Sequence, residues 1–272
     1  MHDGKFPRGG PGAPWWDRLY ETDRAEWIDF VDHPDPRLAE RARRGLRELD
    51  RFQRASLAYR TFSRLALAEV GRPREPRILE LGAGRGHLAE RLLRDHPTAH
   101  VTVSDISPDS VRAFRAGPLG DHPRVTARVI DATAIDAPDR SWDLAVFTMS
   151  LHHLQPAQVR MVFREGTRAA HRLLVIDAWR NPAYLAVVPL LFLLGGTAAA
   201  HDGAISLRKA YHPSALRALA ADCGAPVRLR CGFHPPGYLV ACAHRGAPRA
   251  SGDSAAATAQ DRDRPDAGPS RT

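Results

Sequence analysis

A predicted strand, a glycine-rich turn and a predicted helix follow one another between residues 77 and 95. The apolar run 77–81 leads into Gly82, Gly84 and Gly86, and an amphipathic segment begins directly afterwards. Glycine adopts a positive φ without steric cost, and its bare backbone lets a ligand approach closely. The N–H groups at the start of a helix then face that ligand. This order predicts a unit that holds a nucleotide-like cofactor at the carboxyl end of a strand.

The spacing of the glycines separates two kinds of cofactor. The dinucleotide fingerprint is G-x-G-x-x-G, whereas the third glycine of that pattern is replaced here by His87. The pattern E-x-G-x-G-x-G at residues 80–86 resembles motif I of the class I S-adenosylmethionine-dependent methyltransferases. The resemblance implies S-adenosylmethionine as the cofactor, not NAD, and a binding site that includes Glu80, Gly82, Ala83, Gly84 and Gly86.

Acidic residues end the next two predicted strands. The strand 100–105 ends at Asp105, where a carboxylate can accept hydrogen bonds from both ribose hydroxyls. The alternative is that Asp105 caps the next helix, which begins near residue 107. The strand 124–130 is followed by Asp131. The resemblance implies that Ile106 flanks the adenine and that the Asp131 carboxylate and the Ala132 backbone N–H form hydrogen bonds with the adenine. An ordinary strand-to-loop aspartate is the alternative for Asp131.

Two adjacent histidines follow the fourth predicted strand, 142–147. The passage from Thr148 to Leu154 contains L-H-H-L and is similar to a passage in many small-molecule methyltransferases. The resemblance implies that Thr148 lies at the cofactor and that His152 and His153 face the methyl acceptor. A phenol or enol must lose its proton on methylation, and a histidine with a near-neutral pKa can take it. We favour His153 over His152 as the base or substrate orienter. The alternative is a helix-start histidine bonded to backbone.

The order of elements predicts an α/β fold, a Rossmann-like seven-stranded methyltransferase sheet with an N-terminal helical cap and disordered termini. Strands alternate with helices, and the chemically marked residues fall at the strands' carboxyl ends, where open α/β sheets bind ligands. A fifth strand is predicted at 172–176, and a hairpin at 227–233 and 238–243 matches the one that closes the methyltransferase sheet. The expected boundaries are a disordered 1–14, a helical cap 15–71, the methyltransferase domain 72–245 and a disordered tail 246–272.

An uncharged apolar run covers residues 183–196. A transmembrane helix needs roughly 20 apolar residues, whereas this run is shorter, contains Pro189 and ends in two glycines. We therefore predict a helix that lines or covers a pocket for a lipophilic substrate. The following block, 201–213, is similar to a segment of bacterial methyltransferases encoded near type III polyketide synthases, which are thought to act on phenols and quinones. That resemblance implies Arg208, Tyr211 and His212 as substrate-binding residues.

The formal charge of +8 is unevenly distributed. Between Arg37 and Arg64, nine arginines face three acidic residues, beside an apolar stripe at helical spacing. This basic helix could contact a membrane or an acidic partner, or it could be a solvated face whose arginine stems cover apolar surface. Nucleic acid is a less favoured partner, because the segment after the fourth strand lacks N/D-P-P-Y/F and few aromatic residues accompany the arginines.

These observations predict a methyltransferase that acts on a small lipophilic acceptor, such as a phenol, enol or quinone-type secondary metabolite. An RNA methyltransferase and a non-catalytic S-adenosylmethionine-binding protein are the alternatives. Three unpaired cysteines and an N-terminus without an apolar segment indicate a cytoplasmic protein. The thirteen histidines form no H-x-x-x-H pattern, so no metal site is expected. The oligomeric state is left open by the sequence.

Overall fold

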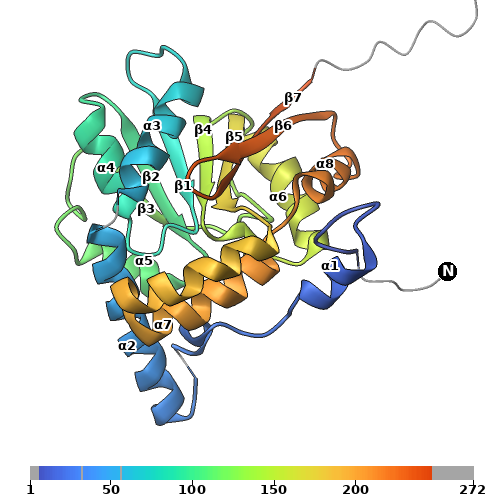
Figure 1. The fold of residues 1–272 in the computed structure, drawn as a ribbon. Helices are drawn as coiled ribbons and strands as arrows, with labels where there is room; N and C mark the ends of the chain where they lie inside the picture. Colours follow the sequence, from blue (N-terminus) through green and yellow to red (C-terminus); the bar gives the residue numbers. More distant parts are fainter. Residues whose placement is uncertain (1–5, 32, 56, 247–272) are drawn as a thin grey trace, which may run out of the picture.

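A seven-stranded sheet forms the centre of the computed structural model, which describes residues 6–31, 33–55 and 57–246 (Figure 1). The strand order is β3-β2-β1-β4-β5-β7-β6. The first five strands pair in parallel, and β7 runs antiparallel between β5 and β6. The bounds are β1 Arg77–Leu81, β2 His100–Asp105, β3 Val125–Val129, β4 Trp142–Thr148, β5 Ala170–Ala178, β6 Val227–His234 and β7 Tyr238–Arg245. The predicted fold class and the closing hairpin are therefore confirmed.

Helices cover both faces of the sheet, which explains why its central strands read as continuous apolar runs. Within β1, Ile78 faces one core cluster while Leu79 and Leu81 face the other, as the two-residue period of a strand requires. The Ile78 side is covered by α3 (Ala58–Val70), α4 (His87–Asp95) and α5 (Pro108–Arg115). The opposite side is covered by α6 (Pro156–Ala169) and α8 (Pro213–Ala221).

A further layer of helices lies over the carboxyl edge of the sheet. It contains α1 (Trp15–Tyr20), the 3-10 turns η1 (Trp27–Phe30) and η3 (Pro182–Val187), α2 (Pro36–Ala55) and α7 (Val188–Lys209). Helix α7 contacts η2 (Leu151–His153), the 3-10 turn that follows β4, and η1 packs against both α2 and α7. The N-terminal segment and the long helical insertion after β5 thus meet above the end of β4.

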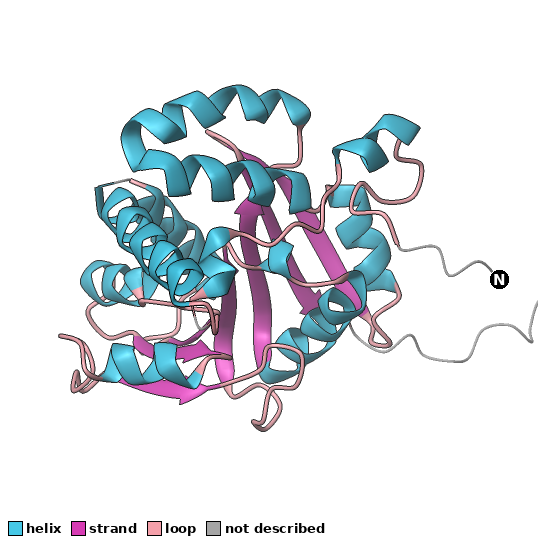
Figure 2. Cartoon of the chain, turned by 90° about the horizontal axis from the view of Figure 1, so that it is seen from below, coloured by secondary structure: helices cyan, strands magenta, loops and turns pink. Residues whose placement is uncertain are grey.

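Helix α7 is a hairpin of two arms (Figures 1 and 2). Gly196 breaks the helix with φ 82° and ψ −172°. The arms lie side by side, because a Cβ added at Gly203 in the second arm would come within 2.7 Å of the Leu191 side chain in the first. Residues Pro182–Lys209 are apolar and long enough, by length and composition only, to cross a membrane. The turn divides that length into two short arms.

The first segment of the chain departs from the sequence prediction. Residues 6–14 were expected to be disordered, but the Arg8 side chain is 1% exposed. Its guanidinium donates hydrogen bonds to the backbone carbonyls of His152 and Lys209, both at 2.8 Å. These contacts dock the segment above the sheet. Residues 1–5 and the tail beyond Gly246, which were also predicted to be disordered, lie outside the described residues.

Candidate active site

The glycine loop after β1 has the backbone conformation that its sequence predicts. Gly82, Gly84 and Gly86 all have positive φ, at 59°, 52° and 73°. A Cβ at Gly82 would lie 2.7 Å from Phe147, and one at Gly86 would lie 2.3 Å from Phe114. A Cβ at Gly84 would meet no atom within 4 Å. The loop is therefore packed on both sides and open at its centre, where a ligand can approach the backbone.

Asp105 ends β2 and holds this loop from the side. One carboxylate oxygen accepts a hydrogen bond from the Gly84 N–H at 2.9 Å, and the other accepts from the Ser107 N–H at 2.9 Å. The N-cap of α5 is Ser107, whose hydroxyl accepts from the Ser110 N–H. Asp105 is thus not the helix cap, and its half-exposed carboxylate lies beside the open centre of the glycine loop.

Glu80 has a contact within the protein that the sequence did not predict. Its side chain is 1% exposed and accepts a hydrogen bond from the Ala89 N–H at 3.0 Å, in the first turn of α4. Burial, together with the nearby Asp105 carboxylate, raises the pKa of Glu80 to about 8. The side chain therefore lies beneath the loop and holds the start of α4, and its direct contact with the cofactor stays a prediction.

The other predicted cofactor residues lie along the same edge of the sheet. The Ala83 N–H donates to the Ser104 carbonyl at 2.8 Å, which ties the loop to β2. Ile106 is 65% exposed at the end of β2. After the neighbouring strand β3, Asp131 accepts hydrogen bonds from the N–H and hydroxyl of Thr133. Ala132 is partly buried against the core, and Thr148 is buried at the end of β4.

His152 lies buried between two carboxylates. The turn η2, to which it belongs, is close to the glycine loop, because a Cβ at Gly82 would lie 3.4 Å from Ser150. The His152 N–H donates to Asp177 at 2.9 Å, and its Nδ1 lies 2.6 Å from the other Asp177 oxygen. On the opposite side of the ring, Nε2 lies 3.6 Å from Glu26 Oε1.

The two carboxylates determine the charge of His152. Burial by itself would lower the pKa of this imidazole. The charge and hydrogen bond of Asp177, with a further contribution from Glu26, outweigh burial and raise the pKa to about 9. His152 is therefore an imidazolium at neutral pH and cannot accept a proton from a substrate.

His153 has the opposite protonation state. Burial lowers the pKa of His153, and the positive charge of the adjacent His152 lowers it further. Its Nε2 lies 3.7 Å from Glu26 and its Nδ1 lies 3.6 Å from Asp29, and the side chain is 28% exposed. A neutral, partly accessible imidazole of this kind can accept a proton. His153 as the base therefore stays a prediction, with which these two protonation states are consistent.

Glu26 is the main residue of this site that sequence reasoning missed. It is 2% exposed, accepts a hydrogen bond from the Ser206 hydroxyl at 2.9 Å and lies 3.8 Å from Lys209 Nζ. Burial opposes its ionisation, yet His152, His153 and Lys209 hold its pKa below the ordinary value. The sequence signal that could have drawn attention to Glu26 is the acid three residues later, Asp29, since the two residues form a reciprocal cap at the start of η1.

Glu26, His152 and His153 also form a group that could hold a metal ion. Their ligand atoms all lie within 4.8 Å of one another. The sequence pattern did not reveal this cluster, because Glu26 lies far along the chain from the two adjacent histidines. The charge of Glu26 is, however, already balanced by the imidazolium of His152 and by Lys209 at 3.8 Å. We therefore assign the group as an ion-pair cluster.

The predicted substrate residues Arg208, Tyr211 and His212 are committed to contacts within the protein. Arg208 Nε donates to the Tyr20 carbonyl at 2.8 Å. The Tyr211 hydroxyl donates to the Leu154 carbonyl at 2.8 Å, and the residue is 1% exposed. The side chain of His212 caps α8. These contacts give the three residues a structural role, and their substrate-binding role stays a prediction.

A buried ion pair fixes α1 near this site. The guanidinium of Arg180 donates to both carboxylate oxygens of Asp17, at 3.1 and 2.8 Å. Arg180 also donates to the backbone carbonyls of Arg208 and Ala210. One arginine thus joins the N-terminal segment to the end of α7.

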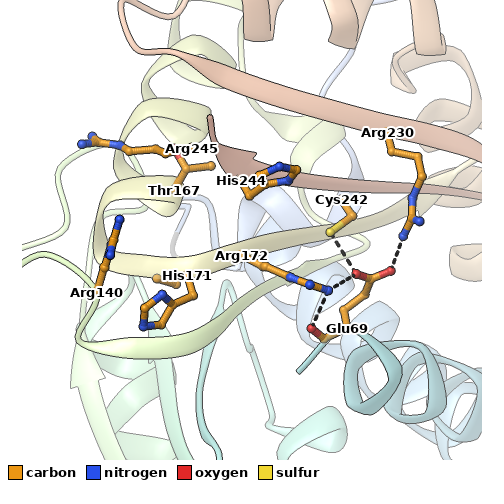
Figure 3. A pocket seen from close by; sticks show the side chains of 10 residues that line it. Glu69, Arg140, Thr167, His171, Arg172, Arg230, Cys242, His244 and Arg245 are labelled. Atoms are coloured by element: carbon orange, nitrogen blue, oxygen red, sulfur yellow. Dashed lines mark hydrogen bonds and ion pairs between the residues drawn. The ribbon is translucent and has the colours of Figure 1, made fainter. Parts of the chain in front are cut away.

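A hollow of about 540 Å³ opens near the start of β5, away from the strand end that carries Asp177 (Figure 3). Glu69 lies within it, 3.0 Å from Arg172 and 2.6 Å from Arg230, and accepts a hydrogen bond from the Cys242 thiol. Arg172 stands near the start of β5, whereas Asp177 stands near its end. This hollow is therefore separate from the glycine loop and the histidine pair.

Comparisons with known proteins agree with this geometry. Residues 78–172 match the family described as a methyltransferase domain. A stretch of 76 residues is 34% identical to the release factor glutamine methyltransferase of Koribacter versatilis and covers 27% of each protein. Human N-acetylserotonin methyltransferase in complex with SAM superposes with a TM-score of 0.57 and 17% identity, over 83% of this chain and 64% of that chain. A pyocyanin biosynthetic protein gives 0.54 and 16%, over 82% and 62%.

The domain match, the sheet order and the glycine loop define the fold of a class I methyltransferase. The chain matches the methyltransferase-domain family at residues 78–172. It spans about a quarter of the curated relative and less than two thirds of the two solved structures.

Proposed function

We propose that this protein transfers a methyl group from S-adenosylmethionine to an ionisable hydroxyl of a small lipophilic acceptor, such as a phenol or an enol. The observation that carries the proposal is the neutral His153 next to a charged His152, in the turn whose N-cap Ser150 lies beside Gly82. A base of this kind is useful for a hydroxyl that must lose its proton. It is unnecessary for mere binding of the cofactor.

The donor would occupy the open centre of the glycine loop, with its ribose at the Asp105 carboxylate and its adenine between the ends of β2 and β3. The acceptor oxygen attacks the methyl carbon while the carbon–sulfur bond breaks, and S-adenosylhomocysteine leaves. Because the sulfonium is already an activated leaving group, the protein mainly aligns the reacting atoms. Alignment of this kind can contribute roughly 7–11 kcal/mol to the barrier reduction.

The acceptor's proton would pass to His153. The imidazolium of His152 keeps this ring neutral before the reaction. Glu26 and Asp29, at 3.7 and 3.6 Å from its two nitrogens, stabilise the positive charge that forms on proton transfer. The charge of His152 therefore lowers the pKa of His153, while Glu26 and Asp29 stabilise the imidazolium that His153 becomes once it has taken the proton. This balance suits a base that works near neutral pH.

Calorimetric titration tests the donor site without knowledge of the acceptor. S-adenosylmethionine should bind, and Asp105→Ala should weaken binding by about ten- to a hundredfold through the loss of charge-assisted hydrogen bonds. Asp109→Ala, which removes a solvent-exposed carboxylate of α5, is the matched control and should bind as the wild type does. Binding of NAD without binding of S-adenosylmethionine would contradict the proposal.

A screen of methyl-donor consumption tests the acceptor. Phenols, enols and quinone-derived metabolites are compared with tRNA, using wild type and His153→Asn. Turnover of a hydroxylated small molecule, lost in the variant while calorimetry shows unchanged donor binding, is the expected result. Methylation of tRNA would instead favour the nucleic-acid alternative. Binding without any turnover would favour a regulatory protein.

A further inference from the structure

The first arm of α7 is apolar on every side and yet exposed. Residues 183–200 contain no charged side chain. Leu190, Phe192, Leu193 and Leu194 are exposed by 51, 53, 77 and 64%. A helix that is apolar all round is normally buried in a core or in lipid, and large exposed apolar patches mark interaction sites. This arm therefore needs a partner that the described chain does not supply.

The hairpin geometry indicates a surface contact and not a membrane crossing. The arm from Pro182 to the turn at Gly196 is roughly 20 Å long at about 1.5 Å per residue. The hydrocarbon core of a bilayer is about 30 Å thick. The second arm is anchored in the protein, since Ala198, Asp202 and Lys209 are buried there.

An arginine-rich helix lies directly beside the hairpin turn. A Cβ at Gly45 of α2 would lie 3.1 Å from the Ala198 side chain, and one at Gly196 would lie 3.0 Å from Glu48. Helix α2 carries seven arginines against three acidic residues. A groove of about 620 Å³ separates α2 from the start of the second arm, and three of these arginines line it: Arg37, Arg41 and Arg44.

These arginines differ in their surroundings. Arg41 stacks on the Trp27 ring at 3.5 Å and so has a structural contact. Arg47, outside the groove, pairs with Glu40 at 2.9 Å. Arg37 and Arg44 are exposed at the groove and present their guanidinium groups next to the apolar turn. Guanidinium groups bind phosphate oxygens through paired hydrogen bonds.

We propose that the α7 turn and the arginines of α2 dock onto the surface of an anionic phospholipid bilayer. The apolar arm enters the boundary between headgroups and acyl chains, while Arg37 and Arg44 bind lipid phosphates. Apolar insertion beside basic residues is the combination that holds proteins at such interfaces. An acidic protein or nucleic acid would satisfy the arginines alone. A second copy would cover the apolar arm but place two arginine-rich helices near each other.

Co-sedimentation with vesicles tests this surface on the full chain. Wild type should bind vesicles of phosphatidylcholine with phosphatidylglycerol and bind vesicles of phosphatidylcholine alone more weakly. The variant Arg37→Gln/Arg44→Gln should lose about fivefold in affinity per arginine on anionic vesicles. Leu193→Ser/Leu194→Ser should lose at least tenfold on the anionic vesicles. Arg112→Gln and Leu57→Ser, which change exposed residues outside this surface, should bind as the wild type does.

Three outcomes would overturn the inference: no binding to anionic vesicles, binding unaffected by the leucine changes, or a dimer in light scattering that those changes dissociate without any vesicle binding. Titration with S-adenosylmethionine shows whether each variant retains its fold. Because vesicle binding needs no methyl transfer, its failure beside intact donor binding refutes this surface and leaves the proposed function standing.

Discussion

The charge of His152 should make the stability of this protein depend on pH. An unfolded histidine has a pKa of about 6.5, whereas the folded protein raises that of His152 to about 9. The folded state thus binds the proton more tightly. Its contribution to stability is fully present below pH 6.5 or so and is lost as the pH rises through about 9. The difference between the two pKa values corresponds to about 3 kcal/mol.

Guanidinium unfolding, followed by tryptophan fluorescence, measures this contribution at several pH values in that window. Wild type should lose about 3 kcal/mol of unfolding free energy across it. His152→Asn, whose amide can still donate to Asp177 from the position of Nδ1, should lose this component of the pH dependence. His153→Asn is the matched control, because the pKa of His153 lies below the ordinary value. It should keep the wild-type slope.

The comparison between the two variants can refute the reasoning. A His152→Asn protein with the same pH dependence as wild type would show that this residue is not the charged histidine. Loss of the dependence in His153→Asn alone would reverse the two assignments and remove His153 as the base.

Three other perturbations have expected outcomes. Gly86→Ala should destabilise the fold by about 2–4 kcal/mol in thermal melting, since its Cβ would meet Phe114 at 2.3 Å. Gly84→Ala should destabilise the fold by only about 1 kcal/mol but should abolish donor binding in calorimetry. Arg180→Met should lower the free energy of unfolding by about 3–5 kcal/mol, because it leaves the Asp17 charge buried without its partner. Adding Asp17→Leu should restore much of that stability. A small effect of Arg180→Met alone would contradict this prediction. Dialysis against EDTA should leave the melting temperature unchanged, because the carboxylate–histidine cluster is already neutralised; a fall would reveal a bound metal.

The sheet could be predicted because its signals are local. The alternation of apolar strands and helices, and the acids at the strand ends, depend only on neighbours in sequence. The positive φ of Gly82, Gly84 and Gly86 could be predicted because it belongs to one short turn. The position of Asp105 at the end of the second strand could be predicted from the lengths of one helix and one strand. Strand ends were less accurate: β5 runs from Ala170 to Ala178 and not from 172 to 176, because pairing with both β4 and β7 extends it.

The other half of the site could not be predicted, since it depends on long-range docking. Glu26 stands in a segment with no periodic pattern, and only the packing of η1 against α7 brings it to His152. Tyr211 shows the converse limit. A sequence identifies a polar residue near a site, but not whether its hydroxyl faces a ligand or, as here, a backbone carbonyl of its own chain.

The contacts of Arg8 have a consequence for the order in which the protein is completed. Its guanidinium binds the backbone of His152 and Lys209, which lie 144 and 201 residues further along the chain. During synthesis at about 5–20 residues per second, the beginning of the chain must wait roughly ten seconds or longer for the second of these partners. Contacts over such separations also close slowly, because long loops must be ordered first. The segment around Arg8 is therefore among the last parts of the active-site cover to reach its native position, after the five parallel strands β1–β5 have been synthesised.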